Sequence, residues 1–172
     1  MLFRSAIVYN FIDGGPDLGV RTLKDEEELG FTLVNSLDDK QKQTAIRADK
    51  APAEYRAGGS PQPPMTPPEG IAAADLNDAQ KEILWNLIKA YNSHLTVDVA
   101  QSNLDEIREA NFDRVYFGWW GATQPSIGHY YRVQGPTFVL EFVNYQDGVG
   151  RTKANHIHSV WRSLKGDFAI PM

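Results

Sequence analysis

A histidine pair near the end of the chain carries the clearest sign of chemistry. The segment that starts at Asn155 reads Asn-His-Ile-His-Ser-Val-Trp-Arg, and one apolar residue separates His156 from His158. In a β-strand alternate side chains point to the same face, so both imidazoles would share one side of a sheet. Neutral imidazole is the commonest metal ligand and a ready proton-transfer group near neutral pH. The pair therefore predicts a metal site or a proton-transfer site.

The sequence around this pair predicts a small sheet. Period-two patterns and turn signals indicate three neighbouring strands, at residues 129–134, 137–145 and 155–162. Gly135 and Pro136 predict a two-residue hairpin loop between the first two of these strands. In that register Tyr130 lies opposite Glu141, and Arg132 shares their face and that of the histidine pair. We therefore expect polar groups to gather on one face of the sheet.

Two imidazoles and one carboxylate form a common set of metal ligands. Together with Glu141, His156 and His158 offer donors for Zn²⁺, Fe²⁺, Mn²⁺ or Cu²⁺ while positions remain open for water or substrate. The sequence contains no cysteine, so thiolate sites are excluded. A slip of one residue in register would move His129 onto this face, and His129 is therefore a reserve ligand. We expect a divalent metal as the cofactor, of an identity that the donors leave open.

The leading hypothesis is a metal-dependent enzyme that activates water or dioxygen and acts on a small polar substrate. Glu141, Tyr130 and Arg132 are its candidate catalytic residues, with Arg132 as the anchor for an anionic or polar group. Three alternatives stay open: histidines that only hydrogen-bond to neighbouring polar groups, a non-catalytic module that binds a carbohydrate or another small molecule, and a metal carrier. Trp119 and Trp120 would give the binding module a stacking surface, although aromatic residues on a strand more often belong to a core.

Composition limits the classes of partner. The chain has 172 residues with a formal net charge of -5, and 42% of them are hydrophobic, which fits one domain over residues 1–172. The mild acidity gives no electrostatic basis for binding nucleic acid or an anionic membrane. No apolar run approaches the length of a membrane span, and the N-terminus lacks the pattern of a signal peptide. A small molecule remains as the expected partner, and the composition leaves the oligomeric state open.

The remaining elements follow from apolar periodicity and capping signals. We expect a strand at residues 6–12 and helices at residues 24–35, 38–48, 78–93 and 97–111, the third of them starting with a capping box at Asn77 and Gln80. Six of the ten prolines lie in residues 51–75, which predicts a loop or a strap across the surface. The expected fold is α+β, with an N-terminal strand and about four helices followed by an antiparallel β-meander of three to four strands.

The C-terminal third also resembles a known family. The run Gly-His-Tyr-Tyr-Arg-Val-Gln-Gly-Pro-Thr-Phe from Gly128, the Asn-His-Ile-His motif and Gly-Asp-Phe at residues 166–168 are similar to the signature of the domain-of-unknown-function 3500 family. Members of that family are generally longer, are often exported, and carry an upstream Gly-His-His motif. The resemblance implies that this chain is an N-terminally truncated member of the family. It also favours an exported or periplasmic location. It strengthens the expected fold and site more than any particular activity.

Overall fold

The computed structural model describes residues 4–9, 21–60, 62–63, 66–146 and 156–166. Its elements, in chain order, are β1 (Arg4–Tyr9), α1 (Lys24–Ser36), α2 (Asp39–Ala45), β2 (Ile46–Ala48), β3 (Ile71–Ala72), α3 (Asp78–Asn92), α4 (Val97–Glu109), β4 (Tyr116–Gly121), β5 (His129–Gln134), β6 (Phe138–Gln146) and β7 (His156–Ser163). Within these residues the fold is α+β, and all four α-helices precede the four long strands of the C-terminal part, as predicted. Residues 10–12 of the predicted first strand lie outside the described residues.

The sheet is larger than predicted and is mixed. The described strands form one seven-stranded sheet in the order β1-β7-β6-β5-β4-β2, with β3 also paired to β4. Strands β4 to β7 form the expected antiparallel meander, but β2 runs parallel to β4. The predicted antiparallel meander is therefore present, but it is part of a mixed sheet whose parallel strand was not predicted. The parallel strand was missed because residues 46–48 were assigned to a helix, whereas α2 ends at Ala45 and Ile46 turns to extended backbone beside Trp119.

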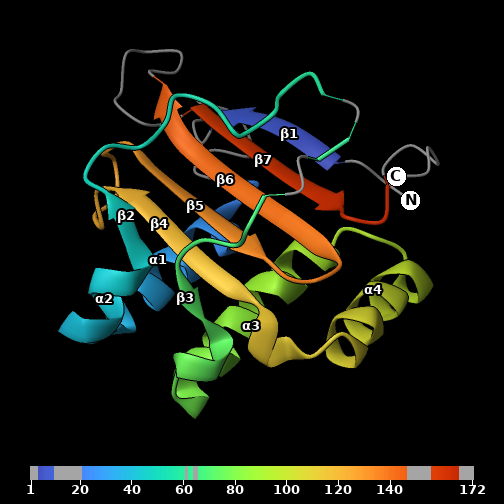
Figure 1. The fold of residues 1–172 in the computed structure, drawn as a ribbon. Helices are drawn as coiled ribbons and strands as arrows, with labels where there is room; N and C mark the ends of the chain where they lie inside the picture. The colour runs from blue at the N-terminus through green and yellow to red at the C-terminus, as the bar shows by residue number, and fades with distance from the viewer. Residues whose placement is uncertain (1–3, 10–20, 61, 64–65, 147–155, 167–172) are drawn as a thin grey trace.

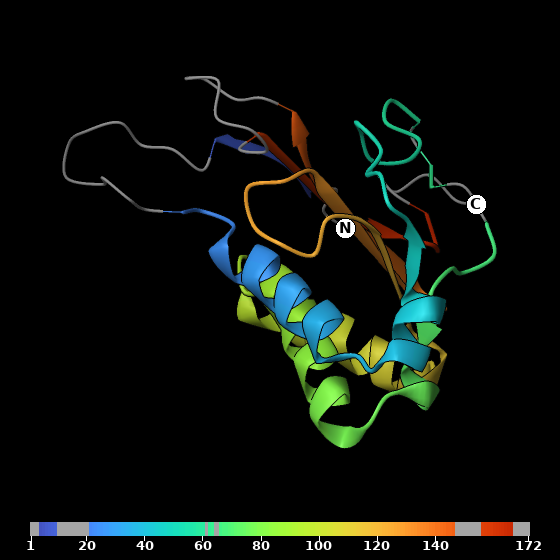
Figure 2. The same ribbon diagram turned by 90° about the vertical axis from the view of Figure 1, so that its left-hand side faces the viewer.

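Helices and strap cover opposite faces of the sheet (Figure 1; Figure 2). The helices lie on one face, where Leu33, Leu84 and Leu87 are fully buried against the aromatic side chains of the sheet. Tyr131 is stacked between Trp119 and Phe142 at ring-centroid distances of 6.0 and 5.2 Å. Each such side chain contributes roughly 1.5–3 kcal/mol by leaving water, so this face holds most of the apolar stabilisation.

Capping boxes set the starts of α2 and α3. The predicted box of α3 is present, with the Asn77 side chain accepting from the Gln80 amide and the Gln80 side chain accepting from the Asn77 amide. A second box, formed by Asp38 and Gln41, starts α2. The two glutamine side chains also exchange hydrogen bonds of 2.9 Å, which fixes the start of α2 against that of α3. Each cap contributes about 1 kcal/mol.

A strap crosses the other face of the sheet. We use this name for residues 51–70, of which 61, 64 and 65 lie outside the described residues. The described part of the strap contains neither helix nor strand, which fits the proline content. The predicted loop ends earlier than residue 75, because Ile71–Ala72 pairs with β4 and Ala73–Asp75 forms a 3₁₀ turn. Gly70 closes the strap with φ +100, and a Cβ there would lie 2.0 Å from the Phe117 carbonyl oxygen.

The β5–β6 hairpin differs from its predicted register by two residues. Gln134 pairs with Val139, and Arg132 pairs with Glu141 in place of Val139. The loop still has two residues but is moved by one position, because the Gly135 amide donates to the Phe138 carbonyl at 3.0 Å and leaves Pro136 and Thr137 between the strands. Phe138 also stacks on Trp161, at a centroid distance of 4.7 Å. Since the shift is even, every side chain keeps its predicted face.

Candidate functional site

The histidine pair lies on the strap side of β7. The Nε2 atoms of His156 and His158 are 2.8 Å apart, so both imidazoles are on the same side of the strand, as predicted. Both side chains are partly exposed. Burial, and then the charge of the neighbouring imidazole, lower the pKa of His156 below its ordinary value. Close approach of two imidazoles through their Nε2 atoms thus favours the neutral ring, the form that binds a metal ion.

A carboxylate from the strap orients this pair. Glu54 Oε1 lies 2.6 Å from Nδ1 of His158. Because an ionised carboxylate only accepts hydrogen bonds, Nδ1 is the donor, and the lone pair of a neutral His158 is on Nε2. That lone pair points at His156. A carboxylate on the far nitrogen of a histidine is the usual partner of a metal-binding imidazole.

A buried cluster of charges lies beside the histidine pair, on the same face. Arg132 and Glu141 are directly opposite each other on β5 and β6, and each is 2% exposed. Nη1 of Arg132 is 3.6 Å from Glu141 Oε1, which also accepts hydrogen bonds from the Tyr130 hydroxyl and, at 3.1 Å, from the Arg56 amide. Burial first, and then the charge of Glu141, raise the pKa of Tyr130 well above that of a free phenol. Tyr130 is therefore a neutral donor to Glu141.

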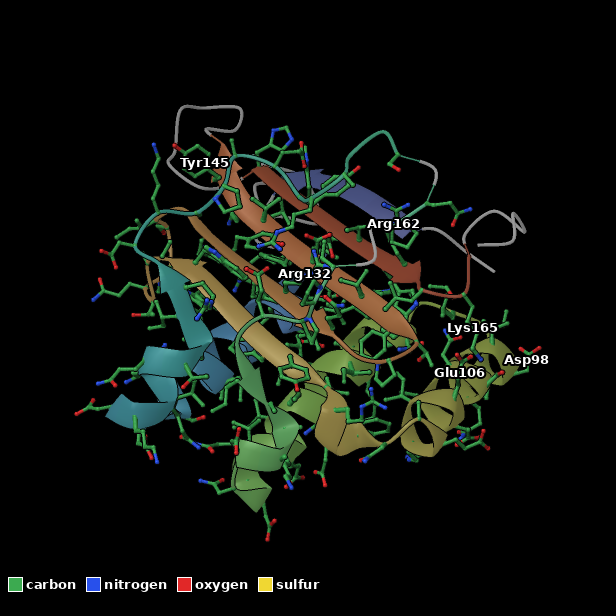
Figure 3. The ribbon with its side chains drawn as sticks, viewed as in Figure 1. Asp98, Glu106, Arg132, Tyr145, Arg162 and Lys165 are labelled. Carbon is green, nitrogen blue, oxygen red and sulfur yellow. The ribbon has the colours of Figure 1, made fainter. Side chains whose placement is uncertain are left out.

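The strap covers this cluster through polar contacts. Arg132 donates to Gln134 Oε1 from Nη2 at 2.9 Å and lies 3.4 Å from the Thr66 hydroxyl, while Gln134 donates to the Thr66 carbonyl at 2.8 Å. On β7, Arg162 donates to the Ser60 carbonyl at 2.9 Å. Figure 3 shows both arginines, Arg132 and Arg162, on the face of the sheet that the strap crosses. Both are almost fully buried, so neither is a surface residue.

An arginine from the strap closes the cluster at one end. Arg56 forms an ion pair with Glu69, also in the strap, and its guanidinium lies 5.1 Å from the centre of the Trp120 ring. Trp120 is 8% exposed and Trp119 is fully buried in the helix-side core. The two tryptophans therefore pack inside the protein, and neither provides an open stacking surface in this structure.

The predicted site residues on the strap side fall into two groups. His156 and His158 form the pair, whereas Glu141, Tyr130 and Arg132 form the buried cluster. Glu141 lies on the predicted face of the sheet, in the strand next to that of the histidine pair. Its carboxylate, however, contacts the Tyr130 hydroxyl and the Arg56 amide in the buried cluster. Among the described residues, no group of three or more His, Cys, Asp or Glu side chains is arranged to hold a metal ion.

His129, the reserve ligand, lies on the opposite face of the sheet. It pairs with Asn144 and is stacked on Trp119 on the helix side. A slip of one residue would have brought His129 to the face of the histidine pair. The observed register of β5 against β6 differs from the predicted one by two residues, so His129 stays on the other face.

Sequence reasoning missed Glu54, Arg56 and Thr66, the strap residues that contact the site. They lie 104, 85 and 66 residues before their respective partners on the sheet, which are His158, Glu141 and Arg132. No local sequence pattern links these pairs. The single available signal was the proline content, which predicted a strap but not which of its side chains turn inwards.

The comparisons with known proteins support a family and no activity. In the part of the chain that the structure describes, none of the helices is long and apolar enough to cross a membrane. The fold and the site define an α+β protein whose sheet carries a histidine pair and a buried charged cluster under a strap. The chain belongs to the family described as protein of unknown function (DUF3500), which matches residues 9–170. Neither a curated protein nor a solved structure matches it.

Proposed function

We propose that this protein is a metal-dependent enzyme that acts on a small polar substrate, with His156 and His158 as ligands of a divalent ion. The observation that carries the proposal is the approach of their Nε2 atoms to 2.8 Å. Two nitrogens that are each about 2.0–2.1 Å from one ion lie roughly 2.9–3.4 Å apart, depending on the coordination angle. The two imidazoles are therefore close to the separation that a shared ion requires.

Glu54 supports the same assignment. It fixes the Nδ1–H tautomer of His158 and directs the Nε2 lone pair towards the shared position. Two protein ligands leave several coordination positions for water, substrate or further donors. An ion with open positions polarises a bound oxygen and lowers the pKa of bound water, which supplies a nucleophile near neutral pH.

The buried cluster is the part of the site that would select the substrate. Arg132 presents a planar guanidinium suited to a carboxylate or another anionic group. Glu141 holds the Arg132 side chain in place and keeps the Tyr130 hydroxyl as a donor beside it. These groups favour a small substrate with at least one anionic or strongly polar end, which reaches them when the strap moves aside.

Metal binding is tested with purified protein by elemental analysis and by titration calorimetry with Zn²⁺, Mn²⁺, Fe²⁺ and Cu²⁺ in turn. We expect one ion to bind tightly at the histidine pair and its affinity there to fall by at least about tenfold in His156→Ala and in His158→Ala. Glu54→Gln should weaken binding by about 10–100-fold, the usual effect of removing a carboxylate behind a ligating histidine. His94→Ala is the matched control, since His94 also contacts a glutamate but has no second imidazole beside it. Equal affinity in all four variants would refute the metal site.

A metal carrier is the second candidate, because among the described residues only His156 and His158 bring imidazoles to this site, and both are partly exposed. Such a site exchanges its ion readily. Turnover separates the two functions: a carrier binds the ion in the assay above but does not convert a panel of small carboxylates, esters and amides, whereas the enzyme converts at least one and loses this activity in Arg132→Met.

A further inference from the structure

A separate polar cluster lies on the helix side of the sheet, away from the strap. It consists of Glu27 on α1, His129 on β5 and Asn144 on β6. All three are buried, with His129 at 0% and Asn144 at 1% exposure. The cluster sits among aromatic rings, since the His129 ring is stacked on Trp119 at 5.6 Å and on Phe142 at 5.8 Å. The function proposed above makes no use of it.

The hydrogen bonds of His129 fix the role of each ring nitrogen. Nδ1 lies 2.9 Å from the Ile127 carbonyl oxygen, which can only accept, so Nδ1 carries a proton. In a neutral ring Nε2 is then an acceptor. It lies 3.3 Å from Oε1 of Glu27, a second acceptor, and has no hydrogen-bond partner. Two acceptors that face each other at this distance need a proton or a cation between them.

Asn144 adds a third atom that could bind a metal ion, next to Glu27 and His129. Its Nδ2 donates to Glu27 Oε1 at 2.8 Å, while its Oδ1 is buried without a partner. His129 Nε2 and Asn144 Oδ1 are two of the three such side-chain atoms in the described part of the chain. Buried polar atoms without partners are rare and often mark a bound water or ion. A half-turn of the Asn144 amide brings Oδ1 beside the carboxylate.

We propose that Glu27, His129 and Asn144 form a second, buried binding site for a divalent transition-metal ion. Imidazole nitrogen, carboxylate oxygen and amide oxygen are all ligands of Zn²⁺ and Mn²⁺. The separations of 3.3 and 2.8 Å around Oε1 agree with ligands that each lie about 2.0–2.2 Å from one ion. The ion ties α1 to the ends of β5 and β6.

Arg21 competes with this ion. Its Nη2 lies 2.5 Å from Oε2 of Glu27, so the carboxylate already has a cationic partner. The Arg21 side chain is 32% exposed and can turn into solvent, whereas Glu27 cannot. Arg21→Gln should therefore raise the affinity of the site. An ordinary ion pair between His129 and Glu27 gives no such gain.

The test uses Zn²⁺ in calorimetry and in thermal unfolding, in the double variant His156→Ala/His158→Ala, so that the histidine pair does not contribute. We expect one Zn²⁺ per chain, binding several-fold more tightly in Arg21→Gln and in Asn144→Asp, which adds a charged oxygen. Asn144→Leu should lose at least about tenfold in affinity. His94→Gln is the control, because the His94–Glu26 contact of 3.1 Å has the same residue types without a third donor.

Nitrogen-15 spectra of the histidine rings decide the result without depending on any substitution. Bound Zn²⁺ should remove the proton from Nε2 of His129 and shift that nitrogen, and ¹¹³Cd²⁺ should show coupling to it. Absence of Zn²⁺ binding in the double variant and in its Arg21→Gln derivative would overturn the proposal. So would an Nε2–H signal that persists at saturating Zn²⁺, since the cluster would then be a buried ion pair only.

Discussion

Replacing Glu141 by glutamine tests how strongly the buried cluster depends on its single carboxylate. The change keeps the side-chain size and an oxygen that still accepts from the Tyr130 hydroxyl and the Arg56 amide. It removes only the negative charge opposite Arg132. At 3.6 Å and an effective dielectric constant of about 20, that charge interacts with the guanidinium by about 4.6 kcal/mol.

We expect Glu141→Gln to lower the free energy of unfolding by about 3–5 kcal/mol, because Arg132 is 2% exposed and keeps its charge without a carboxylate. For a chain of this length each kcal/mol corresponds to roughly 2–4 °C in the unfolding midpoint. The assay is urea and thermal unfolding followed by circular dichroism. Arg132→Met in the same chain should restore part of the loss, since the double variant no longer buries an unpaired charge.

Glu69→Gln is the matched control for this experiment. Glu69 pairs with Arg56, and both side chains are about one third exposed, so its loss should cost less than about 1 kcal/mol. Zinc affinity of the histidine pair should not change in Glu141→Gln, because the contacts of that carboxylate are with the cluster. A cost below about 1 kcal/mol for Glu141→Gln, equal to that of the control, would show that water reaches Arg132 and that our account of the cluster is wrong.

Three further predictions concern the core, the strap and the metal. Burial raises the pKa of three phenols, so stability should fall as the pH rises above about 10, where the unfolded chain releases their protons and the folded chain does not; the three are Tyr91, Tyr130 and Tyr131. Absorbance titration checks this, and ionisation of all seven tyrosines near pH 10 in the folded protein would contradict it. Gly70→Ala should destabilise by more than Gly59→Ala, because both have positive φ but only at Gly70 would the Cβ meet backbone, as unfolding in urea would reveal. A longer family member that carries the upstream Gly-His-His motif should bind Zn²⁺ more tightly than this chain in calorimetry, since added protein ligands replace water; equal affinity would mean that the motif does not join the site.

Local patterns were sufficient to predict most elements of this fold. The Asn77 capping box, the apolar stripes of the helices and the alternation in β5 to β7 each involve residues a few positions apart. The face of each side chain on β5 and β6 was also correct, although the register was not. Face depends only on whether a shift is odd or even, so an error of two residues left the polar face intact.

Contacts between distant segments could not be predicted from the sequence. Pairing of Ile46 with β4 and of Arg4–Tyr9 with β7 depends on how the whole chain closes, and neither leaves a local signal. The same holds for Glu54, which reaches His158 across 104 residues. Sequence reasoning assigned the carboxylate near the histidines to Glu141 because strand neighbours are predictable, whereas strap contacts are not.

The two faces of the sheet are built on different principles, and this difference bears on function. Stacked rings and aliphatic side chains make up most of the helix side, where Glu27, His129 and Asn144 are buried as one small polar cluster. The strap side buries Arg132, Glu141 and Arg162, although well-packed apolar residues would stabilise a fold equally well or better. Buried charges that do not improve stability are more readily explained by a role in binding or catalysis on that face. The strap is attached there by hydrogen bonds to Arg132, Glu141, His158 and Arg162, and Arg132 is also the proposed anchor of the substrate. A substrate that binds Arg132 therefore competes with the strap, and this competition would link occupancy of the site to the position of its cover.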